Sequence, residues 1–404
     1  MNVIFMELCI ITPEFIPIWG GVGSYIIELI KSLPKDINIH VVTPLRKQMG
    51  KEKISLYDYD LSNYFNKNIN VHLMSNAKDT FVYNVFFQLS YLKNIKKIIS
   101  DHKIDVIHYG SQIPEMIEFR NLGVPSVTTI HTTIQGQRNG TKLTRTSFSN
   151  YDFSEKATLI NYPFLNFAEI IYFLKNRNYI TVSEWMKKQL LNKYKIEQSQ
   201  IHVIHNSVDT KVYATDRSID HDKNIILFTG RMIATKGIIF LIKAMPHIIK
   251  KYPDALFQFI GPGDNLMYEN IIKNMKISKK NYSFFGYLNH RNDLIKYYQS
   301  SSVFIAPSLY ENLPIRVLEA MACGLPIVAS NISAMSEAVI NSLNGILTRP
   351  GSVNDIVNAI SHLLSNPDLR KKMGENSRKI ILSKFDSKIN AKKTANLYKS
   401  LIEK

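Results

Sequence analysis

Two basic and two acidic side chains in the second half of the chain have types and spacings that could act on a ligand. Arg231 and Lys236 are separated by four residues, so around a turn a planar guanidinium and a compact ammonium can converge on one anion. Glu311 and Glu319 can accept hydrogen bonds from hydroxyl groups. Each also has an ordinary interpretation. Arg231 and Lys236 could be solvated surface cations, Glu311 a solvated loop carboxylate, and Glu319 a buried carboxylate that needs a partner. The elements that position them therefore matter.

The two glutamates belong to a predicted strand, loop and helix. Residues 302–306 form a short β-branched and aromatic run, Pro307 breaks it, and residues 314–323 have apolar side chains at helical spacing. Glu311 is then expected in the loop at the carboxyl end of a strand, and Glu319 near the middle of the helix that follows. In open α/β sheets, ligands bind at that edge.

Two further predicted strands each lead through a glycine turn into a helix. The first, residues 224–229, comes directly before Arg231 and Lys236, and the second is residues 256–260. The glycines of the two turns are Gly230, Gly261 and Gly263.

The amino-terminal half opens with a predicted strand, a glycine turn and a helix. Residues 3–12 form a continuous apolar run, as expected for a buried parallel strand, and an apolar helix is predicted over 25–33. Gly20 and Gly21 lie between them, where backbone N–H groups can approach a phosphate at the helix N-terminus. The spacing is not Gly-x-Gly-x-x-Gly, so a nicotinamide-dependent enzyme gains little support.

A histidine and a polar segment follow a later strand. His131 comes directly after the predicted strand 124–130, at the edge where ligands bind. A lone histidine is more often structural than catalytic, so the functional interpretation depends on this position. Residues 135–154 are polar, contain Gly136 and Gly140, and are predicted to form a mobile loop.

Length and the alternation of strands and helices predict two domains. The 404 residues exceed what one hydrophobic core usually supports. We expect an amino-terminal Rossmann-like domain at 1–209 and a carboxyl-terminal Rossmann-like domain at 224–385, joined by an interdomain linker at 210–223. A last helix at 386–404 is expected to pack back on the first domain. Further strands are predicted at 37–43, 69–74, 104–109, 179–182 and 282–288, a helix at 164–174, a loop over 46–68, and helices from 346 onward.

Composition limits the compartment and the partners. Cys9 and Cys323 give no disulfide framework and no metal cluster, and the opening residues lack a basic segment and a cleavage site, which predicts a cytoplasmic protein. The net charge of +17 fits an anionic membrane surface or compositional drift, whereas no nucleic-acid-binding motif is found and no nucleic-acid partner is expected. Lysine-bearing amphipathic helices at 91–103 and 184–195 suit either a membrane-facing surface or the outer helices of an α/β domain.

The two glutamates and their surroundings resemble the Glu-x7-Glu signature of retaining GT-B glycosyltransferases of family 4, also called glycosyltransferase group 1. Residues 230–237 match the diphosphate clamp of that family, and 206–209 resemble its Asn-Gly-Val-Asp segment. The resemblance covers nearly the whole chain. It implies a GT-B fold, which is α/β with two Rossmann-like doubly wound domains facing a central cleft.

The resemblance also implies an activity. The chain would be a retaining, metal-independent hexosyltransferase that moves a sugar from a nucleotide diphosphate sugar to a hydroxyl acceptor, in glycolipid, polysaccharide or glycoconjugate synthesis. No further cofactor and no metal ligand are expected, because the Asp-x-Asp at 58–60 lies in a variable loop where it would not serve a metal. The acceptor would be lipid-linked, at the inner face of the membrane, or a soluble small molecule.

Roles for single residues follow from the same resemblance. Arg231 and Lys236 would offset charge on the leaving diphosphate, Glu311 would bind the C3 and C4 hydroxyls of the sugar, and His131 would face the sugar near its C6 hydroxyl. The donor-binding residues would be Gly20, Gly21, Gly230, Gly261, Gly263, Tyr287, Leu288, Asn312, Leu313, Pro314 and Glu319, with Glu319 on the ribose hydroxyls.

One departure from the family pattern and three alternatives stay open. The family commonly has Glu-Gly-Phe-Gly where residues 311–314 read Glu-Asn-Leu-Pro, which leaves the donor sugar undetermined. A sugar-nucleotide epimerase of the same fold, a nicotinamide enzyme and a non-catalytic partner subunit are the alternatives. The four intact charged residues argue against the last of these.

Overall fold

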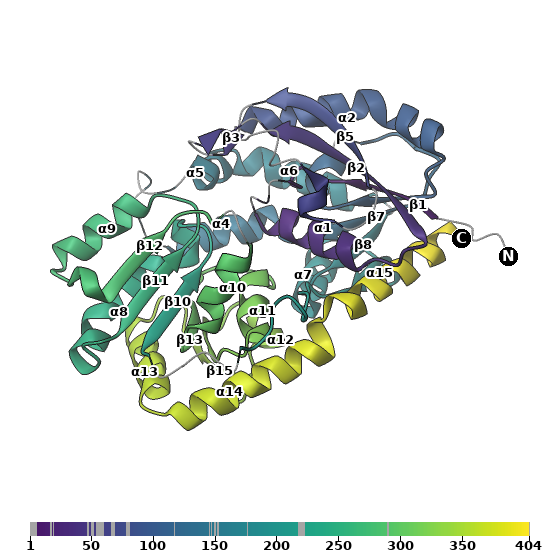
Figure 1. Ribbon diagram of the computed structural model, residues 1–404. Coiled ribbons are helices and arrows are strands. Elements are labelled where there is room, and N and C mark those ends of the chain that lie inside the picture. Colours follow the sequence, from purple (N-terminus) through teal and green to yellow (C-terminus); the bar gives the residue numbers. More distant parts are fainter. Residues whose placement is uncertain are drawn as a thin grey trace. The chain divides into compact units, whose positions relative to one another are not determined.

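The computed structural model describes residues 6–403 except 17, 19, 47, 50–51, 54–59, 66–68, 78–80, 117, 145, 147, 149–150, 152, 176, 217–222 and 289–290. The chain divides into two compact units (Figure 1). The first unit comprises Met1–Thr133, Pro163–Ser207 and Ser387–Lys404, and the second comprises Ile134–Tyr162 and Val208–Asp386.

The first unit is built on a seven-stranded sheet in the order β5-β2-β1-β6-β7-β8-β9, with every neighbouring pair parallel. The order of the chain reverses between β1 and β6, which makes their carboxyl ends the switch point where α/β sheets bind ligands. The strands are β1 (Met6–Ile11), β2 (Ile37–Arg46), β5 (Asn70–Ala77), β6 (Val106–Tyr109), β7 (Ser126–Ile130), β8 (Asn178–Thr181) and β9 (Ile201–Val203). The helices are α1 (Gly21–Ser32), α2 (Phe81–His102), α3 (Gln112–Glu115), α6 (Tyr162–Phe173), α7 (Glu184–Lys193) and α15 (Ser387–Ile402).

Helix α2 covers part of this sheet, and it does so with an apolar face. Its buried side chains Phe87, Tyr91 and Ile95 pack on Val42 of β2 and Met74 of β5. Helix α15, at the other end of the sequence, packs on α1 and β6, where the Tyr398 hydroxyl is hydrogen-bonded to Nδ1 of His108. The first unit therefore contains residues from both ends of the chain.

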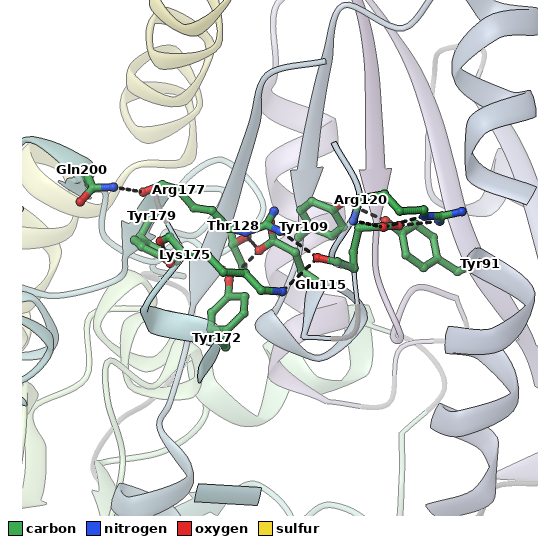
Figure 2. A network of polar contacts seen from close by, with 11 residues as sticks. Tyr91, Tyr109, Glu115, Arg120, Thr128, Tyr172, Lys175, Arg177, Tyr179 and Gln200 are labelled. Carbon is green, nitrogen blue, oxygen red and sulfur yellow. Dashed lines mark hydrogen bonds and ion pairs between the residues drawn. The ribbon is translucent and has the colours of Figure 1, made fainter. Parts of the chain in front are cut away.

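A buried polar network lies in the same unit (Figure 2). The carboxylate of Glu115, which is fully buried, forms an ion pair with Arg177 and accepts hydrogen bonds from Thr128 and from the Tyr172 hydroxyl, the latter at 2.6 Å. Arg177 also donates to the backbone oxygen of Glu118, at 2.9 Å. A buried charge costs free energy unless it is paired and hydrogen-bonded, and here both conditions are met.

The second unit is built on a six-stranded parallel sheet in the order β12-β11-β10-β13-β14-β15. Its switch point lies between β10 and β13. The strands are β10 (Ile225–Thr229), β11 (Leu256–Ile260), β12 (Tyr282–Phe285), β13 (Val303–Ala306), β14 (Ile327–Ser330) and β15 (Gly345–Thr348). The helices are α4 (Ile134–Leu143), α5 (Phe153–Ile160), α8 (Ile238–Lys251), α9 (Asn265–Asn274), α10 (Arg291–Gln299), α11 (Ile315–Ala322), α12 (Met335–Ala338), α13 (Val353–Leu364) and α14 (Pro367–Ile380).

Shorter elements complete the chain. Strands β3 (Gln48–Met49) and β4 (Glu52–Lys53) pair antiparallel, inside the segment predicted as a loop. The single turns are η2 (Leu61–Asn63), η4 (Gln198–Gln200), η5 (Ala234–Lys236) and η6 (Lys279–Asn281), and η7 (Ile381–Phe385) is π-helical. Within the described residues, no helix combines the length and the apolar character needed to cross a bilayer.

The doubly wound α/β class predicted from the sequence is confirmed in both units, and three further local predictions are wrong. Helix α1 begins at Gly21, four residues earlier than expected, so the glycines form its first turn. Residues 134–143 are the helix α4, not a loop, because tertiary packing on its glycines overrides their low helix propensity. Residues 345–348 form the edge strand β15 before the last helices begin.

The structure also divides the chain differently from the expected boundaries. Residues 134–162 and 208–216 belong to the second unit. Tyr213 is buried there, and Arg378 donates hydrogen bonds to the backbone oxygens of Thr210 and Tyr213, at 2.8 and 2.7 Å. The start of the expected linker is thus held against the second unit by Arg378.

Candidate active site

Two loops at the switch point of the second unit bring Lys236 and Glu311 together. The first follows β10 and ends in η5, and the second follows β13, the strand paired with β10. Gly237 adopts φ 68°, in the left-handed region, and a Cβ there would lie 2.0 Å from the backbone oxygen of Pro307. Only glycine allows this approach. A backbone hydrogen bond of 2.8 Å from Leu309 to Thr235 then joins the two loops.

Lys236 and Glu311 form an ion pair between these loops. Their side chains are 22% and 17% exposed, so the pair lies in a partly dry site that a ligand can still reach. Burial, together with the positive charges of Arg231 and Arg316, lowers the pKa of the Lys236 ammonium to about 7. The Glu311 carboxylate opposes this shift because it favours the charged form. Three basic side chains therefore act on one small volume next to Glu311.

The glycines predicted to bind donor lie in neighbouring turns at the same edge of the sheet. Gly230, Gly261 and Gly263 all have φ between +139 and +148°, a conformation that L side chains rarely adopt. A Cβ on Gly261 would lie 2.0 Å from the backbone oxygen of Gly230, and one on Gly263 would lie 2.6 Å from Cβ of Met232. Their first role is therefore to let the loops after β10 and β11 pack closely.

Glu319 of α11 has a different environment. Its side chain is 3% exposed. The hydroxyls of Tyr213 and Tyr298 each donate a hydrogen bond of 2.8 Å to it, one to Oε1 and one to Oε2. Nη1 of Arg316 donates to both oxygens, at 3.1 and 2.8 Å. Burial and the Glu319 charge raise the pKa of Tyr298, which keeps its hydroxyl protonated as a donor.

Helices α4 and α5 pack against the two loops that carry Lys236 and Glu311. The ring of Tyr310, the residue before Glu311, lies on Gly136 and Gly140 of α4: a Cβ on either glycine would come within about 2.2 Å of Tyr310 atoms. The carboxylate of Glu155 in α5 accepts a 3.0 Å hydrogen bond from the backbone N–H of Thr235, the residue before Lys236. One segment, residues 134–160, therefore contacts the neighbours of both charged residues.

The remaining donor-site predictions lie at the same carboxyl edge. Asn312 and Leu313 are buried, and Pro314 precedes the first residue of α11. Tyr287 and Leu288 follow β12, the outermost strand beside β11, and are half-buried.

The other three predicted residues lie in the first unit, around its own switch point. His131 follows β7, and its Nε2 donates a 3.0 Å hydrogen bond to the backbone oxygen of Gly110, directly after β6. Burial lowers the pKa of His131 to about 4, so its imidazole is neutral near pH 7. Its ring also meets that of Tyr25 edge-on, with centroids 4.8 Å apart.

Gly20 and Gly21 stand at the amino end of α1, and a carboxylate already occupies that position. Oε2 of Glu14 accepts a 3.3 Å hydrogen bond from the N–H of Gly23, and a Cβ on Gly20 would lie 2.6 Å from the same oxygen. A negative side chain at a helix N-terminus is favourable, but it competes with a bound phosphate.

Sequence reasoning missed five residues that shape this site. One of them left a signal of its own, because the spacing from Arg316 to Glu319 places both side chains on one face of a helix. A second, Tyr310, left an indirect one, because the four-residue interval from Gly136 to Gly140 places two glycines on one helix face where a ring can pack. The others are distant in sequence from their partners. The five are Glu155, Tyr213, Tyr298, Tyr310 and Arg316.

Comparisons with known proteins identify the family and the fold. The family model described as Glycosyltransferase Family 4 matches residues 19–212, and the model described as Glycosyl transferases group 1 matches residues 209–380. An uncharacterized glycosyltransferase of Methanocaldococcus jannaschii is 27% identical over 418 residues, which cover 98% of this chain and 99% of the relative.

Two further similarities extend over nearly the whole chain. The UDP-Gal:alpha-D-GlcNAc-diphosphoundecaprenol alpha-1,3-galactosyltransferase of Escherichia coli is 25% identical over 405 residues, covering 92% of this chain and 99% of that one. The solved structure of sucrose-phosphate synthase from Thermosynechococcus elongatus superposes with a TM-score of 0.77 at 18% identity, covering 98% and 99% of the two chains. The chain belongs to glycosyltransferase family 4, group 1, has the GT-B fold, and is a glycosyltransferase.

Proposed function

We propose that this glycosyltransferase moves a hexose from a nucleoside diphosphate sugar to a hydroxyl group with retention of anomeric configuration and without a metal ion. The observation that carries the proposal is the cluster at the β10/β13 switch point, where Lys236 faces Glu311 and where Arg231 and Arg316 add positive charge. Cations preorganised in a partly dry site stabilise negative charge that develops as a bond breaks.

The cations are assigned to the leaving diphosphate. An ammonium whose pKa is near 7 gains a second negative partner when a diphosphate arrives, which raises its pKa and fixes its charge. Arg231 supplies planar donors to the same group. These side chains then provide the electrostatic stabilisation that a bound metal gives in other transferases.

Glu311 is assigned to the sugar. Its carboxylate lies beside the diphosphate-binding cation and is open enough to accept hydrogen bonds from the C3 and C4 hydroxyls. We assign the reaction to front-side attack, in which the acceptor hydroxyl forms the new bond to C1 and passes its proton to the departing phosphate oxygen. Neither glutamate is then required as a base.

Glu319 is assigned a positioning role. All its hydrogen bonds in the structure go to Tyr213, Tyr298 and Arg316, so a ribose hydroxyl would have to displace one of these donors. Of these three side chains, Arg316 also adds to the positive charge around Lys236. We therefore propose that Glu319 acts on the diphosphate through Arg316.

In the first unit, His131 is assigned to the sugar and the Gly20-Gly21 turn to its phosphate side. A neutral imidazole donates or accepts a hydrogen bond without adding charge. The carboxylate of Glu14 at the start of α1 argues that the main diphosphate contacts belong to the second unit.

The acceptor is proposed to be a hydroxyl on a lipid-linked sugar at an anionic membrane surface. The Escherichia coli relative is named for a diphosphoundecaprenol acceptor, and the chain carries a net charge of +17. Phe164 and Phe167 of α6, and Leu174 directly after it, are 72%, 62% and 65% exposed, at spacings that place them on one face. Exposed aromatic and aliphatic side chains on one helix face suit insertion among lipid headgroups.

A screen of nucleoside diphosphate sugars tests the function. With EDTA present, one donor should raise the melting temperature, be slowly hydrolysed, and transfer its sugar to a polyprenyl-diphosphate sugar with the anomeric configuration of the donor, as read by mass spectrometry and NMR. Activity that is lost on chelation and restored by Mn²⁺, or a product of inverted configuration, would contradict the proposal. Vesicle co-sedimentation tests the membrane part, since binding should require anionic lipid and weaken with salt.

A further inference from the structure

Three histidines gather at the amino end of the sheet in the first unit, away from the carboxyl ends where the candidate active site lies. They are His40 of β2, His72 of β5 and His102, the last residue of α2. One nitrogen from each ring lies within 4.8 Å of the others. Figure 1 shows α2 running along β5 and β2, the two strands that carry the other histidines.

The sheet register explains why these side chains meet. Val42 of β2 pairs with His72, and His40, two residues earlier, points to the same face as Val42. Glu7 of β1 pairs with Asn38, which is again on that face. Helix α2 covers this face of the sheet with apolar side chains. Past the last of these apolar side chains, at the amino ends of the strands, the side chains on the face are polar.

The distances approach those of a metal site. Nδ1 of His40 lies 3.1 Å from Nε2 of His72, close to the separation of about 3.3 Å between two nitrogens on one tetrahedral zinc ion. Nε2 of His40 lies 3.1 Å from Oε2 of Glu7. A metal-binding histidine commonly donates its second N–H to a carboxylate in this way, which fixes the ring and raises its basicity as a ligand.

There is also room for an ion. A cavity of about 400 Å³ is lined by Glu7, Asn38, Ile39, His40, Asn70 and His102. Imidazole binds metals through a nitrogen of its neutral form. The rings of His40 and His102 are 4.4 Å apart between centroids, and no charged group other than Glu7 is hydrogen-bonded to His40 among the described residues.

We propose that His40, His72 and His102 form a binding site for one divalent transition-metal ion of the zinc type, with Glu7 holding His40 in place and a water as fourth ligand. Imidazole ligands suit zinc, copper and nickel rather than Mg²⁺ or Ca²⁺. Because the three ligands come from three elements, the ion fixes the end of α2 against β2 and β5. The site is separate from the transferase chemistry and stabilises the first unit.

Metal titration of the full chain, without a histidine tag, tests the site. Calorimetry with Zn²⁺ should show one ion per chain, Co²⁺ should give the intense visible bands of a tetrahedral complex, and Zn²⁺ should raise the melting temperature. His72→Gln and His102→Gln should each weaken Zn²⁺ binding by roughly 100-fold, and Glu7→Gln by about tenfold or more. His247→Ala, an exposed histidine of α8 in the second unit, is the matched control and should bind as the unaltered chain does.

The outcomes separate this site from the proposed function. EDTA should remove the ion and lower the melting temperature while donor turnover stays unchanged. Absence of stoichiometric Zn²⁺ binding, or equal affinity in His72→Gln, His102→Gln and His247→Ala, would overturn the inference. His102→Gln serves as the variant least disturbing to folding, because its position ends a helix and lies outside the sheet.

Discussion

Glu115 in the first unit and Glu311 in the second both pair with a basic side chain, but in different surroundings. Glu115 is fully buried, and Arg177, Thr128 and Tyr172 fill its acceptor positions. Glu311 is partly exposed, and Lys236 has a pKa lowered to about 7. A buried, saturated pair fixes the fold, whereas an open pair beside additional cations can exchange partners with a ligand. Pairing alone therefore does not identify a functional carboxylate.

The largest expected effect is on stability and comes from the first pair. Glu115→Ala leaves the Arg177 charge buried without its partner and should lower the free energy of unfolding by about 3–5 kcal/mol. Urea titration measures this, and turnover of the folded protein should stay close to that of the unaltered chain. Arg349→Ala breaks the exposed pair with Asp355 and serves as the control, with little expected change. A loss as small as that control would remove the distinction between the pairs.

The opposite pattern is expected at the second pair. Lys236→Met should lower turnover by roughly 100-fold or more, because the leaving diphosphate loses a charge-assisted contact, while the unfolding free energy changes little. Steady-state kinetics at saturating donor measure this. Lys243→Met, an exposed lysine on α8, is the matched control. Turnover near the native value in Lys236→Met would show that the clamp is misassigned.

A third test concerns Glu319, which resembles Glu115 in burial but lies next to the active site. Glu319→Gln should weaken binding of a nucleoside diphosphate by about 1.5–3 kcal/mol, as expected for hydrogen bonds to a charged group. If Glu319 acts through Arg316, binding of the free nucleoside stays unchanged. Calorimetry with both ligands decides, and an equal loss for the nucleoside would favour direct contact with ribose.

A smaller effect is expected where α4 supports Glu311. Gly140→Ala places a Cβ against Tyr310 and should displace the Glu311 loop, with turnover lowered by roughly tenfold. Tyr310→Ala should give a similar loss, whereas Tyr310→Phe keeps the ring and should be near native. Equal activity in Tyr310→Ala and Tyr310→Phe would show that the ring does not position Glu311.

The smallest effect is a pH dependence. Because the pKa of Lys236 is lowered to about 7, the side chain loses its proton as pH rises above that value, and diphosphate affinity should fall. Between about pH 6.5 and about pH 8.5 we expect roughly fivefold weaker binding. Lys236→Arg stays charged over this range and should bind with little pH dependence. A rise in affinity with pH in the unaltered chain would contradict the assigned charge state.

Much of the fold was predictable because parallel strands buried on both faces read as apolar runs. The runs at β1, β10 and β13, with the glycines after the first two and Pro307 after the third, indicated the doubly wound class and placed Arg231, Lys236 and Glu311 in loops. The fold class and the loop positions of these charged residues were therefore predictable from the sequence alone. The proximity of Lys236 to Glu311 was not predicted; it follows from the pairing of β10 with β13 in the structure, which brings the two loops to one edge.

The unpredicted parts depend on contacts between distant segments. Gly136 and Gly140 suggested a loop by propensity, whereas the ring of Tyr310, far along the chain, packs on both glycines of the helix that the segment forms. Glu319 was assigned to ribose from the family resemblance. Its donors Tyr213 and Tyr298 come from other elements, so no local pattern showed that they occupy its carboxylate. The histidine cluster is spread over three elements, and no local spacing pointed to it.

The return of α15 to the first unit has a consequence for synthesis of the protein. The chain passes between the two units four times, and Tyr398, near its end, is hydrogen-bonded to His108 inside the first sheet. On the ribosome, domains generally fold as units from the amino terminus. Here the first sheet cannot gain its last buried contacts until the second unit and α15 have been made. Truncation within the final helix should therefore reduce the yield of folded protein by exposing the face of α1 and β6 that α15 covers.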